Sequence, residues 1–143
     1  MNGLPGILGS GMPETYEMLQ ILKFMHSALL KFPKAIELPI EFVTFLKSID
    51  EALQVYESSS KDQEADLNYW DAANTAREIY RADVMIRFSG TKEPLSAGYL
   101  IDLLTKMENK VQSGITKALA TNGNHLYNLY TIYFIYFFML VYL

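Results

Sequence analysis

The pattern of apolar and polar positions along this chain predicts amphipathic helices. In the two segments that begin near Pro13 and Pro39, apolar side chains recur at steps of three and four residues. This spacing places them on one face of an α-helix. The first stripe, within residues 13–31, is Tyr16, Leu19, Leu22, Met25 and Leu29; the second is Phe42, Leu46, Ile49, Leu53 and Tyr56. Each proline suits the first turn of a helix, where the N–H that it lacks would have no intrahelical partner.

Two further helices are predicted after the polar linker of residues 58–62. Asp62 or Asp66 is suited to cap the third helix, at about residues 64–82. The apolar stripe of this third helix is Leu67, Trp70, Ala73, Ala76 or Arg77, and Tyr80. The fourth helix is predicted at residues 94–119, and its stripe is Leu100, Leu104, Met107, Val111, Ile115 and Ala118. Between these helices, residues 84–88 either form a short β-prone run or extend the third helix, and residues 89–94 form a turn. Short connections between amphipathic helices predict an all-α bundle with antiparallel neighbours.

The chain divides into a lead-in, a helical domain and an apolar tail. Residues 1–12 are rich in glycine and are expected to be irregular, and residues 13–120 form the helical domain. Every Asp, Glu, Lys and Arg lies at or before Lys117, so the tail of residues 121–143 carries no such charge. The fold class is therefore predicted as a bundle of four amphipathic helices followed by an apolar tail that is itself helical.

Composition excludes several functional classes. The net charge of −4 argues against nucleic acid as a partner, because such proteins need a basic surface. The absence of cysteine excludes disulfides, a thiolate nucleophile and cysteine-ligated metals. His26 and His125 lie far apart and have no carboxylate at metal-ligand spacing. We therefore expect no catalytic residue, metal or cofactor here. The N-terminus lacks the basic region of a signal peptide, which favours a cytoplasmic location.

One turn resembles a phosphate-binding loop. The stretch from Arg87 to Pro94, RFSGTKEP, is similar to the loop of phosphohexomutases that reads Arg-Pro-Ser-Gly-Thr-Glu-Pro. The candidate phosphate ligands are Arg87, Ser89, Gly90 and Thr91, since a guanidinium, hydroxyls and exposed N–H groups suit a phosphate. The chain departs from that loop by a phenylalanine in place of the first proline and by an inserted lysine. The alternative is a polar turn between helices.

A second candidate surface lies in residues 68–81. This segment, NYWDAANTAREIYR, mixes aromatic residues with Asp, Asn and Arg, as sugar-binding surfaces do. Trp70 is the candidate for stacking on a sugar ring. However, Trp70 and Tyr80 also fit the packing stripe of the third helix, and core packing is the favoured interpretation.

Three stretches resemble one family of enzymes. Residues 2–25, 69–90 and 100–120 are similar to an internal portion of large bacterial carbohydrate-active proteins of the cellobiose-phosphorylase-like kind. The resemblance implies a helical scaffold whose catalytic carboxylate lies elsewhere in the larger protein. It implies that this chain is a truncated portion without activity of its own, and that its partner is the remainder of the enzyme or another helical protein.

The tail from Leu126 to Leu143 has three interpretations. Its eighteen uncharged residues nearly reach the roughly twenty that span a bilayer. Tyrosine recurs at every third position from Tyr127 to Tyr136, a period of neither helix nor strand. The tail is therefore an out-of-frame end, a membrane anchor or a buried helix. The functions left open are a truncated enzyme portion, a tail-anchored protein with its helical domain in the cytoplasm, and a phosphosugar-binding module.

Overall fold

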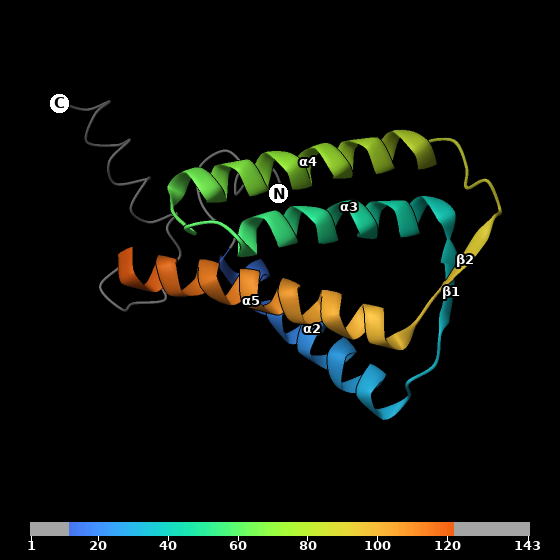
Figure 1. The fold of residues 1–143 in the computed structure, drawn as a ribbon, viewed down its shortest axis with the longest axis horizontal. Helices are drawn as coiled ribbons and strands as arrows, with labels where there is room; N and C mark the ends of the chain where they lie inside the picture. Colours follow the sequence, from blue (N-terminus) through green and yellow to red (C-terminus); the bar gives the residue numbers. More distant parts are fainter. Residues whose placement is uncertain (1–11, 122–143) are drawn as a thin grey trace. The chain divides into compact units, whose positions relative to one another are not determined.

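The computed structural model describes residues 12–121, which form four helices and one two-stranded sheet (Figure 1). The helices are α2 (Met12–Lys31), α3 (Ile40–Glu57), α4 (Gln63–Val84) and α5 (Ala97–Thr121), and the strands are β1 (Ile36–Pro39) and β2 (Lys92–Leu95). The all-α prediction is confirmed. The predicted apolar tail, including the candidate span from Leu126 to Leu143, lies outside the described residues.

The described residues fall into two compact units, of which the first comprises residues 12–24 and 108–121. In this unit Leu19 of α2 packs with Ile115 of α5, and both are buried. Partly buried Tyr16 and Val111 pack around them, as do Ala118 and Leu119. All of these except Leu119 belong to the predicted stripes of the first and fourth helices. The predicted stripe of the first helix is wrong at Met25, which is 46% exposed.

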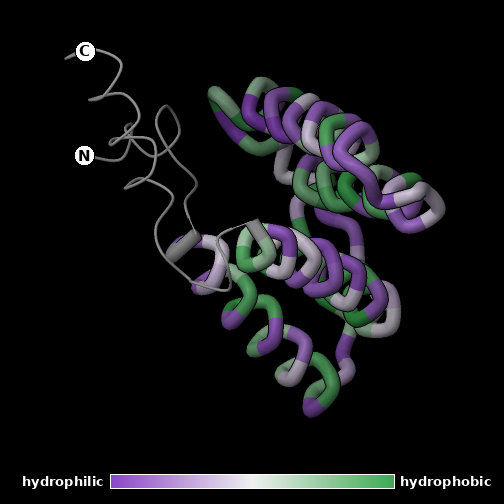
Figure 2. The backbone as a smooth tube through the Cα atoms, turned by 90° about the vertical axis from the view of Figure 1, so that its left-hand side faces the viewer, coloured by the Kyte–Doolittle hydropathy of each residue, from purple (hydrophilic) through white to green (hydrophobic). Residues whose placement is uncertain are grey.

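The second unit, residues 25–107, contains the helical pair α3 and α4. The predicted stripe of α3 is confirmed at Leu46, Ile49, Leu53 and Tyr56, which are all buried, whereas its first member, Phe42, is partly buried. Leu53 and Val43 are completely inaccessible to solvent. Figure 2 shows hydrophobic and hydrophilic residues alternating along each helix, as this one-sided burial requires.

The packing stripe predicted for α4 is wrong at its first two positions. Leu67 and Trp70 are 62% and 61% exposed, so neither belongs to the core. The buried residues of α4 are instead Ala65 and Ala76. Tyr80 packs on α3 as predicted, with its ring stacked 5.1 Å from that of Phe45. Alanine lets two helix backbones approach closely, which a larger residue at these positions would prevent.

The boundaries of α4 and α5 follow from local capping. The Asp62 side chain accepts a hydrogen bond from the Ala65 N–H at 2.9 Å, so Asp62 rather than Asp66 is the cap of α4. The predicted start of the fourth helix at Pro94 is wrong. The Ser96 hydroxyl accepts a hydrogen bond from the Tyr99 N–H at 3.2 Å, and α5 begins at Ala97.

The small sheet was not predicted. Strands β1 and β2 pair antiparallel, with Ile36 opposite Leu95 and Pro39 opposite Lys92. The Ile40 N–H extends the pairing by donating to the Thr91 carbonyl at 3.0 Å. Residues 92–94, expected to belong to a turn, therefore lie in a strand. The sheet ties the segment before α3 to the segment after α4, at one end of the helical pair (Figure 1).

Candidate functional site

An open groove of about 600 Å³ runs along the α3–α4 pair, entirely within the second unit. We call it the α3–α4 groove. Its lining comes from α3 and α4 and from the connection between them: Ser48, Glu51, Ala52, Val55, Tyr56, Ser59, Ser60, Asp62, Glu64, Ala65, Asn68, Tyr69, Ala72, Thr75, Ala76 and Ile79. The candidate surface predicted at residues 68–81 supplies six of these residues, but Trp70 is not among them. The α3 side of the groove was not predicted, because the groove is formed by the pairing of two helices.

Apolar residues of two sizes shape the groove. Four alanines line it, and of these Ala52, Ala65 and Ala76 are buried. Val55 and Ile79 also line it but are 67% and 56% exposed. Small residues beside larger exposed ones create a trough with apolar ridges, which suits the side chains of another helix.

Two tyrosines of the groove lining pack together. The rings of Tyr56 and Tyr69 lie 5.7 Å apart in a tilted arrangement. Burial raises the pKa of Tyr69 above its ordinary value of 10.0, so its hydroxyl is neutral at physiological pH. Tyr56 is only 4% exposed, so its ring is closed to a ligand, whereas Tyr69 is partly exposed. The pair acts as support for the groove.

The groove is acidic. Its lining includes Glu51, Asp62 and Glu64 but no lysine or arginine. The segment that contains most of the lining, residues 48–76, carries seven carboxylates and one lysine. Asp62 is held in place, because its second oxygen accepts from the Ser60 hydroxyl at 2.6 Å. The arrangement produces a negative potential along an apolar trough, which favours a positively charged partner.

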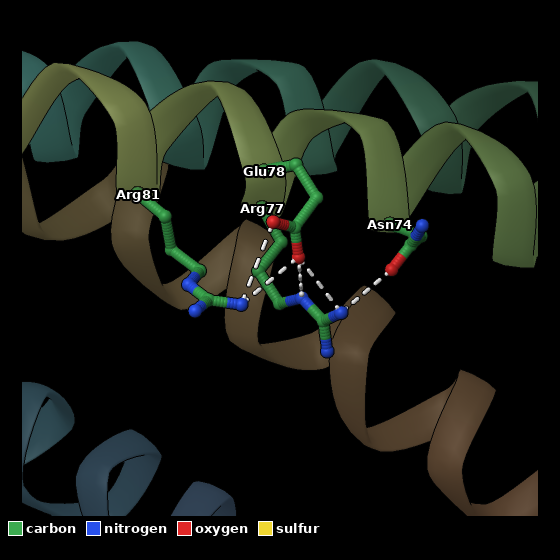
Figure 3. Close-up of polar contacts among 4 residues, drawn as sticks. All are labelled: Asn74, Arg77, Glu78 and Arg81. Atoms are coloured by element: carbon green, nitrogen blue, oxygen red, sulfur yellow. Dashed lines mark hydrogen bonds and ion pairs between the residues drawn. The ribbon is translucent and has the colours of Figure 1, made fainter.

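The outer face of α4 carries a network of polar contacts (Figure 3). Glu78 accepts hydrogen bonds from both Arg77 and Arg81, and Arg77 also donates to the Asn74 side-chain oxygen at 2.7 Å. The Arg77 hydrogen bond and the charges of both arginines lower the pKa of Glu78. Trp70 lies four residues before Asn74, so the two share a helix face. The indole of Trp70 is 61% exposed.

A carboxylate from α3, that of Glu41, contacts the predicted phosphate-binding turn. The Ser89 N–H donates to Glu41 Oε1 at 2.7 Å, and contacts with Ser89 lower the pKa of Glu41. Gly90 has a φ of +89°, which glycine adopts without strain. Ser89, Gly90 and Thr91 therefore form one turn, and Arg87 is exposed just before it. A phosphate at the Ser89 N–H would have to displace Glu41, which disfavours this turn as an anion site.

A partly buried ion pair lies within the second unit and was not predicted from the sequence. Lys106 of α5 donates to Asp50 of α3 at 2.6 Å, and the Gln54 amide donates to the other Asp50 oxygen at 3.2 Å. Burial, followed by the charge of Asp50, raises the pKa of Tyr99. One sign of this pair is present in the sequence, since the charged residue Asp50 directly follows Ile49 of the apolar stripe. Because the two charges satisfy each other, we interpret the pair as structural.

Residues 12–121 contain no cluster of three histidine or acidic side chains that could hold a metal. Within the same range, no helix combines the length and hydrophobicity that a bilayer span requires. No protein-family model, curated protein sequence or solved structure matches the chain. The function must therefore be argued from the surfaces described above.

Proposed function

We propose that this chain is a non-catalytic helical module that packs against another helical protein. The observation that supports this proposal is the exposed apolar face of α2. Met18 is 54% exposed, Ile21 57% and Phe24 74%. Soluble proteins rarely leave such a group of large apolar side chains in water, and contiguous apolar patches commonly mark interfaces.

The exposed face of α2 is separate from its packed face. Leu19, Leu22 and Leu29 are buried, whereas Met18, Ile21 and Met25 form a second stripe at steps of three and four. A helix that is apolar on more than one face is typical of a helix covered by protein on more than one side. Full burial of each exposed side chain would contribute roughly 1.5–3 kcal/mol.

For the partner, we propose the remainder of a larger bacterial carbohydrate-active enzyme. The resemblance of residues 2–25, 69–90 and 100–120 to cellobiose-phosphorylase-like proteins supports this choice. The first of these stretches includes the exposed residues of α2. In this proposal the catalytic carboxylate belongs to the partner portion, and the chain alone neither turns over a sugar nor binds it tightly.

The first test is to sequence the coding DNA from the codon of Lys117 through several hundred bases beyond that of Leu143, in all three forward frames. We expect another frame to continue as a soluble helical protein. The polypeptide that joins both parts should then show strong protection of α2 amides from hydrogen exchange, relative to the chain alone. A sound reading frame with no continuation in any other would overturn the proposal.

A second proposal is a tail-anchored helical interaction protein, favoured by the uncharged segment from Leu126 to Leu143. Its helical domain would face the cytoplasm. The chain should then remain in the membrane pellet after a carbonate wash and should be released by cleavage at Asn122. Recovery of the uncut chain in the carbonate supernatant would eliminate this proposal.

A third proposal, a phosphosugar-binding module, uses Arg87, Ser89, Gly90 and Thr91. The turn formed by Ser89, Gly90 and Thr91 supports this proposal, whereas the contact between Glu41 and Ser89 opposes it. Millimolar phosphosugar should protect residues 87–91 from hydrogen exchange in the native chain but not in Arg87→Ala. Absence of protection in the native chain would eliminate the module.

A further inference from the structure

We infer that the α3–α4 groove is a docking site for a basic amphipathic helix of a partner protein. The groove is a different surface from the exposed face of α2, so this inference does not depend on the identity of the larger enzyme. Three properties support it: the length of the groove, the size of its lining residues and its charge.

The groove has the length of a peptide helix. Its lining on α4 extends from Glu64 to Ile79, and on α3 it begins at Ser48. At a rise of about 1.5 Å per residue, the α4 side is roughly 22 Å long. A helix of about 12–15 residues covers this distance. A single sugar ring or nucleotide would occupy only part of such a trough.

The lining residues suit a helix lying along the groove. Ala65, Ala72 and Ala76 are separated by seven and four residues, so they form one row of small side chains along α4. Val55 and Ile79 stand exposed beside the alanines. Larger apolar side chains of an incoming helix can fill the space above the alanines and contact both ridges, as in other helix-in-groove complexes. Stacking of a sugar is less suited, because of the two tyrosines in the lining Tyr56 is buried and Tyr69 is only partly exposed.

The charge of the groove selects a basic partner. Glu51 and Glu64 are exposed at its edges, and no cationic residue lines it. Lysines or arginines that flank the apolar stripe of the incoming helix would pair with these carboxylates. The chain's own tail from Leu126 to Leu143 is uncharged, so it would cover the carboxylates without neutralising them. A basic helix from another protein is therefore the occupant that matches both the apolar and the acidic features.

The probe for this inference is a synthetic fourteen-residue peptide, fluorescently labelled and blocked at both ends. It carries Leu and Ala at helical spacing, with Lys at the flanking positions. The control peptide has Glu in place of every Lys. Binding to the full chain is measured by fluorescence anisotropy at low and high salt, and hydrogen exchange locates the bound region. We expect the Lys peptide to protect residues 48–79 and to bind at least about tenfold more tightly than the Glu peptide.

Two charge-reversal variants separate the groove from the overall charge. Glu51→Lys/Glu64→Lys should weaken binding of the Lys peptide by about tenfold or more. Asp83→Lys/Asp102→Lys changes the net charge equally at exposed positions outside the groove lining, and should leave binding within about twofold, since remote surface charges are screened. Circular dichroism checks that both variants fold. If Glu51→Lys/Glu64→Lys does not fold, Glu51→Gln/Glu64→Gln is measured in its place. That variant should lose much of the preference for the Lys peptide over the Glu peptide.

Several results would overturn the inference. Equal binding of the two peptides would show that charge does not select the occupant. Protection outside residues 48–79 would place the site elsewhere. No binding of either peptide would also overturn it, and a concentration-dependent dimer in sedimentation would then identify a second copy as the occupant. None of these results bears on whether α2 is covered by the remainder of an enzyme.

Discussion

Helices α3 and α4 pack against each other but contribute to the core very differently. Helix α3 buries seven residues, including Val43, Leu46 and Leu53, whereas the buried residues of α4 are Ala65 and Ala76. Both helices are amphipathic, so the difference lies in the size of the side chains that face inward. Helix α3 supplies the apolar volume that holds the unit together. Helix α4 supplies a flat, alanine-lined face, and its large apolar residues remain available on the surface.

The largest effect should come from removing core volume in α3. Leu53→Ala deletes a side chain with no exposed surface and should destabilise the second unit by about 3–4 kcal/mol. Leu67→Ala in α4 removes the same atoms from a 62% exposed position and should change stability by less than about 0.5 kcal/mol. Urea denaturation followed by circular dichroism measures both. Similar losses for the two variants would contradict the contrast between the helices.

These two leucines also show where sequence reasoning succeeded and failed. The stripe of α3 was predictable because large apolar residues alternate with polar ones at helical spacing. In α4 the packed face is made of alanine, which gives little hydrophobic contrast. The larger Leu67 and Trp70 therefore dominated the pattern and indicated the wrong face.

The sheet and the groove were unpredictable for a different reason. Strands β1 and β2 each contain only four residues, each includes a proline, and Ile36 pairs with Leu95 far along the chain. No local pattern encodes that pairing. The groove likewise requires α3 and α4 to be brought together. In the sequence, it is visible only as the spacing of Ala65, Ala72 and Ala76.

The next effect concerns the partly buried ion pair that joins α3 to α5. Lys106→Ala leaves the Asp50 carboxylate without its cation and should destabilise the second unit by about 2–3 kcal/mol. The loss is smaller than for a fully buried pair because the Lys106 side chain is 23% exposed. The double variant Asp50→Leu/Lys106→Leu should recover most of this loss, since it removes both charges. A double variant less stable than Lys106→Ala would contradict this view of the pair.

A smaller effect should follow from removing the cap of α4. Asp62→Ala deletes the acceptor of the Ala65 N–H and should cost about 1 kcal/mol. Asp71→Ala, in the middle of the same helix, removes an equal charge without removing a cap. Thermal unfolding of both variants separates the hydrogen bond from the change in charge. Equal shifts in Tm would show that charge alone accounts for the effect.

The smallest expected effect is the pH dependence that Glu41 and Glu78 introduce on the two sides of this helical pair. Both carboxyl groups have a pKa lowered below the ordinary value of 4.5, Glu41 by its contacts with Ser89 and Glu78 by Arg77 and Arg81. A carboxyl group whose pKa is lowered by folding stabilises the folded state at pH values above its unfolded pKa. That contribution disappears as the pH falls through the folded pKa. Urea titrations between neutral pH and the acid range should therefore show a shallower loss of stability in Glu41→Gln and Glu78→Gln than in the native chain.

Salt separates the two carboxylates. Because Glu78 lies on the exposed face of α4, its contribution to stability should shrink at high salt. The Glu41 hydrogen bond to the Ser89 backbone should be less sensitive to salt. An unchanged acid slope in Glu41→Gln would show that the turn around Gly90 is held without this carboxylate, and would reopen that turn to an external anion.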